Sequence, residues 1–322
     1  MKQSRIWLAG LLAVQLVAAL LIFNESRTSD NEAVDEPLLT TAPAEVDRIV
    51  VRGSDSEANL VKVDEAWVLP SLDNLPASPS RVSEILEELA AIDTRWPVTR
   101  TRASHQRFEV ADEAPQRYVQ LSAGDAPVAE FYLGTSPGFR KVHLRRVAED
   151  PVYAVELSVH DLPDRDGDWL DKTLLAVQDP TRIEGPDYTL VQSGEDHWSM
   201  ENGADQDAAT VPPVDDERAR QLVSALAGLR VQSAVEKPQE NDPGKTKTLS
   251  LGVETAAGHL DFTFMTADGE YFVQRSDRDT LFSISQYDYE RITEINRAEL
   301  AADSGASEDG EEGAGGEEPL AG

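Results

Sequence analysis

The sequence predicts an α+β protein: two tandem copies of an antiparallel-sheet module with one main helix each, preceded by a single transmembrane helix. Three observations support this prediction. The chain begins with one long apolar run, two sets of short strand-like runs recur about 130 residues apart, and each set contains one amphipathic stretch with helical spacing. Strands grouped around a single helix are typical of an antiparallel sheet that is covered on one face.

The apolar run at residues 6–23 has the length and the flanking charges of a membrane anchor. Its 18 residues, at about 1.5 Å of rise each, span about 27 Å as a helix, which is close to the hydrocarbon thickness of a bilayer. Lys2 and Arg5 precede the run, whereas acidic residues dominate the sequence after it. Because positive charge is retained on the cytoplasmic side, we expect a cytoplasmic N-terminus at residues 1–5 and a periplasmic body on the far side of the inner membrane. A cleaved signal peptide is the alternative, and it exports the body as well.

Two segments flank the predicted modules, and their compositions do not favour a packed core. Residues 24–44 are polar and acidic and contain proline, which predicts a tether between the membrane and the body. Residues 301–322 consist mainly of Gly, Ala, Ser and acidic residues, which predicts a disordered acidic tail.

The body divides into two predicted α+β repeats, residues 45–178 and residues 179–300. Each begins with strand-like runs that include a tryptophan, Trp67 in the first repeat and Trp198 in the second, 131 positions later. Four further strand-like runs follow the helix of each repeat, and several of them alternate apolar and polar residues as half-buried strands do. The spacing between corresponding runs stays near 130 residues, which predicts a duplication.

One amphipathic helix is predicted within each repeat. Ser80 is expected as the N-cap of the first helix, and Asp215 or Asp216 is expected to begin the second. Apolar residues at helical spacing form the predicted buried stripes of the two helices: Val82, Ile85, Leu86, Leu89 and Ile92, then Ala219, Leu222, Val223, Leu226 and Leu229.

The composition excludes several classes of function. Acidic residues outnumber basic ones by 60 to 29, and the resulting net charge of -31 repels nucleic acid. The chain has no cysteine, which excludes disulfides, thiolate catalysis, Cys-ligated zinc and a lipid-modified cysteine. Its five histidines lack the spacing of a metal site, so we expect neither a metal nor another cofactor.

Two motifs imitate functional sites. The run Gly134–Gly138 matches G-x-S-x-G, but its serine is followed by Pro137, which lacks the backbone N–H that an oxyanion hole requires. We predict a tight turn between two strands there. The run Asp164–Asp168 resembles a calcium loop, but Trp169 and Leu175 stand where the EF-hand pattern needs Gly and Glu. We predict a solvated acidic turn there, and no catalytic residue is assigned.

A basic and aromatic cluster follows the first of these turns. Phe139, Arg140, Lys141 and His143 lie together in an otherwise acidic body. We expect them to form a docking patch for a partner, because guanidinium and ammonium groups bind carboxylates, phosphate groups and acidic surfaces. The alternative is an ordinary strand with charged side chains on an exposed face, which is common at sheet edges.

Several runs of the chain resemble one bacterial protein family. They are Trp67-Val68-Leu69-Pro70, Trp96-Pro97-Val98, Arg107-Phe108, Asp168-Trp169-Leu170-Asp171-Lys172 and, above all, the run from Leu133 to His143. Over about residues 46–300 the chain resembles the domain-of-unknown-function family numbered four thousand three hundred and forty. The second repeat departs from this pattern, with Thr266–Glu270 where the Gly-Thr-Ser-Pro-Gly run is expected. The resemblance implies a membrane anchor, one or two copies of the domain, and partnership with gliding-motility-type ABC transporter auxiliary proteins.

We therefore expect a membrane-tethered, extracytoplasmic binding or scaffold protein, an accessory of an envelope ABC-type transport assembly rather than an enzyme. The alternative is an extracytoplasmic hydrolase or glycan-active enzyme that works through carboxylates. A hydrolase requires a deep pocket with perturbed acids, whereas a scaffold presents a groove, an apolar surface or an open sheet edge.

Overall fold

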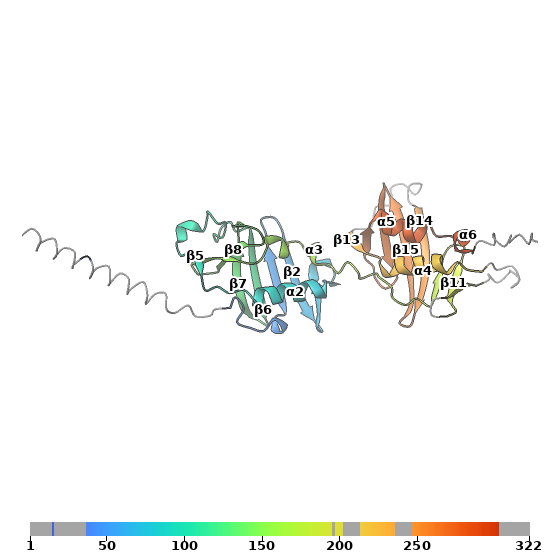
Figure 1. The fold of residues 1–322 in the computed structure, drawn as a ribbon, viewed down its shortest axis with the longest axis horizontal. Coiled ribbons are helices and arrows are strands. Elements are labelled where there is room, and N and C mark those ends of the chain that lie inside the picture. The colour runs from blue at the N-terminus through green and yellow to red at the C-terminus, as the bar shows by residue number, and fades with distance from the viewer. Residues whose placement is uncertain (1–14, 16–36, 195–196, 202–212, 236–246, 303–322) are drawn as a thin grey trace, which may run out of the picture. The chain divides into compact units, whose positions relative to one another are not determined.

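The computed structural model describes residues 15, 37–194, 197–201, 213–235 and 247–302. The chain divides into two compact units, Met1–Asp171 (unit 1) and Lys172–Gly322 (unit 2), and the described part of each contains one antiparallel sheet and few helices (Figure 1). A mixed α+β fold is therefore confirmed. The predicted anchor at residues 6–23 lies outside the described residues apart from Gln15. In the part of the chain that is described, no helix has the length and apolarity needed to span a bilayer.

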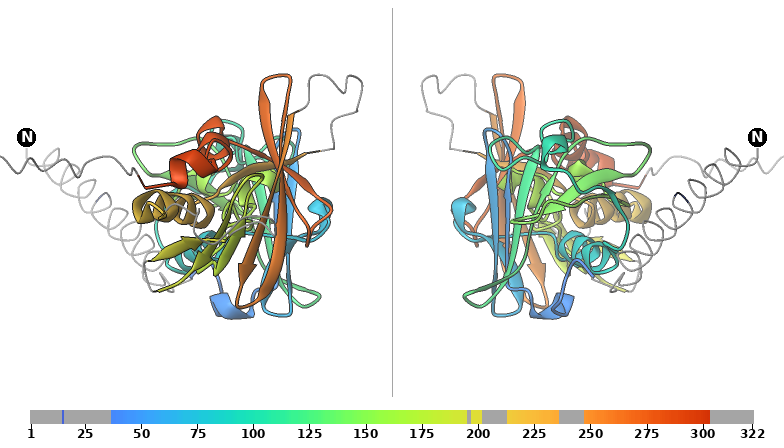
Figure 2. Two further views of the ribbon diagram at one scale, coloured as in Figure 1. Left: turned by 90° about the vertical axis from the view of Figure 1, so that its right-hand side faces the viewer. Right: turned by 90° about the vertical axis from the view of Figure 1, so that its left-hand side faces the viewer.

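Within the described residues, unit 1 contains a nine-stranded sheet in which all neighbouring strands run antiparallel. Its strands are β1 (Arg48–Arg52), β2 (Glu57–Val63), β3 (Ala66–Leu69), β4 (Leu75–Pro76), β5 (Pro97–Thr99), β6 (Arg117–Ala123), β7 (Ala126–Leu133), β8 (Val142–Arg146) and β9 (Val152–Val155). Their order is β4-β3-β2-β1-β6-β7-β8-β9-β5. Helix α2 (Pro79–Ala90) lies on one face of this sheet (Figure 2). The remaining helical segments are short: η1 (Pro43–Glu45), η2 (Pro70–Leu72), η3 (Arg102–Ser104), η4 (Val159–Asp161) and α3 (Asp166–Trp169).

The described part of unit 2 contains an eight-stranded antiparallel sheet. Its strands are β10 (Arg182–Glu184), β11 (Thr189–Gln192), β12 (Trp198–Met200), β13 (Val231–Val235), β14 (Lys247–Thr255), β15 (Gly258–Ala267), β16 (Glu270–Arg275) and β17 (Leu281–Ile284). Helices α4 (Asp216–Ala227) and α5 (Gln286–Thr293) lie on the same side of the sheet, and α6 (Arg297–Leu300) follows (Figure 2). Helix α5 was not predicted, because it is short and buries Ile292 alone among its described residues, which leaves little helical periodicity in the sequence.

The two sheets have the same strand order once β4 is set aside. The strands β12-β11-β10 correspond to β3-β2-β1, the strands β14 to β17 correspond to β6 to β9, and β13 at one edge corresponds to β5. In both units the edge strand comes directly after the main helix in the sequence.

The core of each unit follows from the alternation of its strands and the stripe of its helix. In β1, Ile49 and Val51 are buried and the arginines at both ends of the strand are exposed. The helices bury the following residues: Val82, Ile85, Leu86 and Leu89 in α2, and Ala219, Leu222, Ala225 and Leu226 in α4. Val223 is only half-buried, because Ala225 occupies the buried stripe in its place. Each fully buried aliphatic side chain contributes about 1.5–3 kcal/mol to folding.

The beginnings of the two main helices test the predicted caps. Helix α2 begins at Pro79 with Ser78 in the N-cap position, so the prediction of Ser80 as the cap is wrong. The reason is that Pro79, with its fixed φ and no N–H, suits the first helical position. Asp215 caps α4 by accepting hydrogen bonds from two backbone N–H groups at 2.9 and 3.3 Å, as predicted.

Candidate docking site in unit 1

The G-x-S-x-G motif lies in a loop, residues 134–141, that joins β7 to β8, and its root is fixed by main-chain hydrogen bonds. The N–H of Gly134 donates to the carbonyl of His143 at 3.0 Å, and the N–H of Thr135 donates to the carbonyl of Phe108 at 2.9 Å. A Cβ on Gly134 would lie 1.9 Å from that Phe108 oxygen, so glycine is needed for this close approach. The segment around Phe108 and the root of the loop therefore form one packed structure.

His143 lies beneath this loop with 6% of its surface exposed. Its ring centroid is 4.1 Å from that of Phe108, and its Nδ1 is 3.0 Å from the Thr135 hydroxyl oxygen. Burial lowers the pKa of His143 below its usual value, although a hydrogen bond with Thr135 acts in the opposite direction. His143 was expected in the docking patch, but the structure places it in the packing that supports the loop from below.

The tip of the loop, Phe139 to Lys141, lies in solvent. Phe139 is 93% exposed, and Arg140 and Lys141 form no ion pair with any other residue that the structure describes. The Ser136 hydroxyl lies 2.7 Å from the carbonyl oxygens of Gly138 and Lys141, which it helps to hold together. The structure confirms a strand-to-strand turn here, because β8 rather than a helix follows the motif.

A groove of about 940 Å³ lies beside the tip. One side is formed by Glu88 of α2 and the residues after the helix, 91–93, and another by residues 154–158, which comprise the end of β9 and the segment after it. The three tip residues line the groove as well. An exposed aromatic ring, a groove, and two cations that have no ion pair among the described residues thus meet at one place on unit 1, and such a surface is suited to binding a peptide segment or a protein.

A second basic segment, which sequence reasoning missed, lies next to the first. Residues 94–108 and residues 134–148 together hold eight of the 29 basic residues and none of the 60 acidic ones. The eight are Arg95, Arg100, Arg102, Arg107, Arg140, Lys141, Arg145 and Arg146. The two segments meet where the ring of Phe108 packs on His143. A scan of the sequence for stretches without acid would have found both.

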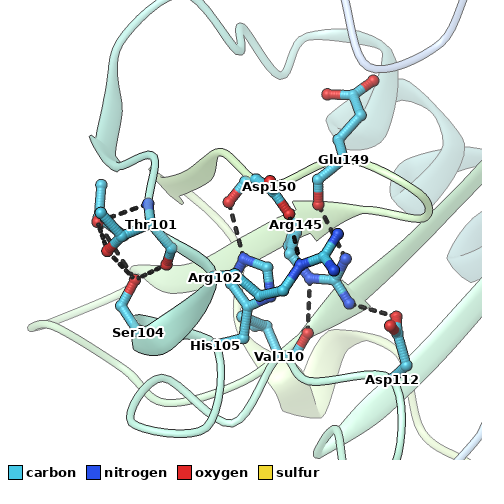
Figure 3. Close-up of polar contacts among 10 residues, drawn as sticks. Thr101, Arg102, Ser104, His105, Val110, Asp112, Arg145, Glu149 and Asp150 are labelled. Carbon is cyan, nitrogen blue, oxygen red and sulfur yellow. Dashed lines mark hydrogen bonds and ion pairs between the residues drawn. The ribbon is translucent and has the colours of Figure 1, made fainter.

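Arg145 shows that part of this basic set is structural. It is 2% exposed, and its guanidinium donates from Nε to the carbonyl of Val110 at 2.7 Å and from Nη1 to the carbonyl of Glu149 at 2.9 Å (Figure 3). Its Nη2 pairs with Asp112 at 2.5 Å, which lowers the pKa of that carboxyl group, and the guanidinium lies 4.6 Å from the centre of the Tyr132 ring. Arg145 therefore fastens two loops to β8 and is not available to a partner.

The acidic run Asp164–Asp168 is also structural in part, so the prediction of a solvated turn is only half right. Asp164 forms an ion pair with Arg117 at 3.1 Å, and Asp166 accepts a hydrogen bond from the backbone N–H of Asn59 at 2.9 Å. Among the described residues, no group of three or more His, Cys, Asp or Glu side chains is arranged to hold a metal ion.

Replacing Gly134 by alanine should destabilise unit 1 by about 1–3 kcal/mol, because the added Cβ forces the Phe108 carbonyl away from the loop. Gly138→Ala is the matched control in the same loop, since a Cβ there meets open space. Equilibrium urea unfolding measures both variants. Equal stability of the two would contradict the close approach at Gly134.

Replacing Arg145 by methionine should lower the free energy of unfolding by about 1–3 kcal/mol or more, because the buried Val110 carbonyl loses its hydrogen-bond donor. Arg102→Met is the control, since Arg102 is 81% exposed in its ion pair with Asp150 and such pairs contribute about 0–1 kcal/mol. The two unfolding free energies are compared directly. If Arg102→Met lowered the free energy of unfolding as much as Arg145→Met, burial of the Arg145 guanidinium would not be the cause of the destabilisation.

Comparison with known proteins places the chain in a family. No curated protein and no solved structure gives a significant match. The model of the family described as Domain of unknown function (DUF4340) matches residues 67–251, from β3 in unit 1 to β14 in unit 2. Because this match covers more than half of the chain, the protein belongs to the DUF4340 family.

Proposed function

We propose that this chain is a membrane-tethered, extracytoplasmic binding or scaffold protein and an accessory component of an envelope ABC-type transport assembly. The apolar run at residues 6–23, with bases before it and acids after it, supports an inner-membrane anchor with the body in the periplasm. The resemblance to family members that partner ABC transporter auxiliary proteins supports the accessory role.

The tip of the loop between β7 and β8 is the observation that carries a binding function. Phe139 is almost fully exposed, although burying a phenylalanine is strongly favourable. Arg140 and Lys141 next to it have no ion pair among the described residues, and aromatic and arginine side chains are enriched at protein interfaces. Hydrogen bonds at Gly134 and Thr135 already fix the root of the loop. A partner that docks on the tip therefore has to order few additional residues, which keeps the entropic cost of binding low.

We also propose that the two units are tandem copies of one module. Their shared strand order supports this, as does the position of Trp67 in β3 and of Trp198 in the corresponding strand β12. Two modules on one tether bind a partner more tightly if both engage it. In unit 2, however, only Asp268 and Gly269 separate β15 from β16, so the docking function is assigned to unit 1 alone.

A carboxylate-based hydrolase is the second candidate, and Glu88 in the groove is the observation that favours it. Burial raises the pKa of Glu88, the nearby carboxylates of Asp161 and Glu84 raise it further, and Arg140 lowers it. A carboxyl group with a raised pKa is suited to act as a general acid. Glu88→Gln separates the two candidates, since it abolishes such catalysis and leaves docking on Phe139 to Lys141 intact.

The docking role is tested by purifying the tagged, full-length protein from membranes in mild detergent and identifying co-purified proteins by mass spectrometry. The unmodified protein should recover ABC-type membrane subunits. The double variant Arg140→Glu, Lys141→Glu should lose most of that recovery, about tenfold or more, because two favourable charge contacts become repulsive.

The matched control is Arg218→Glu, Arg220→Glu on the exposed side of α4, which changes the net charge by the same amount in unit 2. It should retain the partners. Equal loss of partner recovery in both double variants would show that net charge, rather than the loop tip, determines the recovery. Absence of ABC-type subunits from the unmodified sample would refute the accessory role.

A further inference from the structure

The edge of unit 1 that is formed by β5 exposes apolar side chains. Trp96, directly before β5, is 72% exposed, and Val98 within β5 is 51% exposed. β5 is the last described strand at this edge. Pro97 limits further pairing here, since proline has no N–H to donate to another strand.

The residues around these apolar side chains carry positive charge. Residues 94–108 contain four arginines and no acid, in a chain whose net charge is -31. Two nearby acids are already paired, Asp93 with Arg95 and Asp150 with Arg102 at 3.2 Å. Arg100 and Arg107 form no ion pair with any residue in the described ranges. The edge is therefore both apolar and cationic.

This edge lies where the chain that leads to the predicted anchor joins the body. The guanidinium of Arg146 donates to the carbonyl of Pro37 at 2.8 Å and to the hydroxyl of Thr94 at 3.3 Å, and the N–H of Leu38 donates to the carbonyl of Ile92 at 3.1 Å. Leu38 is fully buried, which fastens this point of the chain to unit 1.

The sequence places this attachment within reach of the bilayer. Thirteen residues, 24–36, separate the predicted anchor from Pro37, and at about 3.4 Å each they span at most about 45 Å. The edge of residues 94–108 is thus held near the membrane that carries the anchor.

We propose that this edge rests on the anionic lipid headgroups of that membrane, with Trp96 at the interface and Arg100 and Arg107 on lipid phosphates. The inference rests on the proposed anchoring of residues 6–23, and it concerns a surface other than the docking tip. Tryptophan prefers the membrane interface, and clusters of basic residues next to a membrane bind anionic headgroups. A protein partner fits the same charges, but the bilayer is the surface that the tether always keeps within reach.

The absence of cysteine allows a clean test with single labels. Val98→Cys places an environment-sensitive fluorophore beside Trp96, and Val63→Cys is the control, since Val63 is 49% exposed at the end of β2, which five strands separate from β5. The full-length protein is reconstituted in nanodiscs of phosphatidylglycerol and phosphatidylethanolamine that contain a lipid with a nitroxide near its headgroup. Quenching at position 98 should exceed that at position 63 at least twofold.

Charge is tested in the same system. Arg100→Glu, Arg107→Glu should reduce quenching at position 98 to the level at position 63, as should nanodiscs of phosphatidylcholine alone, and added salt should weaken it. Circular dichroism confirms that the double variant is folded. Equal quenching at both positions, or quenching independent of lipid charge, would overturn the lipid contact. A fluorophore at position 98 that is shielded from water in native membranes, but is not quenched by the nitroxide lipid in nanodiscs, would show that a protein covers the edge instead.

Failure of the anchor gives a different result. A chain that does not co-elute with nanodiscs would refute the proposed anchoring. Co-elution without quenching at position 98 would refute only the lipid contact.

Discussion

The close approach of the Phe108 carbonyl to Gly134 is the constraint on which the candidate docking site of unit 1 depends. It joins two segments, residues 94–108 and residues 134–148, that are separate in the sequence and share an absence of acidic residues. Because the root of the loop is bonded on both sides, its tip can present Phe139 to solvent without collapsing onto the body. The edge that carries Trp96 is positioned separately, by the pairing of β5 with β9.

Basic residues in these two segments have distinct tasks, although the sequence presents them as one group. Arg145 is buried and connects loops, and Arg146 holds the chain at Pro37. Arg140 and Lys141 are exposed at the tip, beside the groove. These exposed cations form a local positive patch, which attracts acidic partners or anionic headgroups, whereas the net charge of -31 on the chain as a whole repels them.

The fold class and the main helices could be predicted from the sequence, because period-two strands and amphipathic stripes are local signals. The burial of His143 and Arg145 could not be predicted from the sequence. All but the last residue of β8 is buried, since chain segments cover both of its faces, and alternation then carries no information on exposure. Of the four residues predicted for the docking patch, the three at the tip are at the surface and His143 is beneath them, and the docking role stays a prediction. The exposed edge beside Trp96 was not predicted, because β5 pairs with β9, whose residues are distant in the sequence.

We propose that the loop tip is a contact surface for another envelope protein. A photo-crosslinking amino acid in place of Phe139, in the full-length protein in its native membrane, tests this most directly. Tyr287 on α5, which is 65% exposed, is the matched position for comparison. We expect a defined adduct with one membrane-associated protein from position 139 and none from position 287. No adduct from position 139, or the same adducts from both positions, would contradict it.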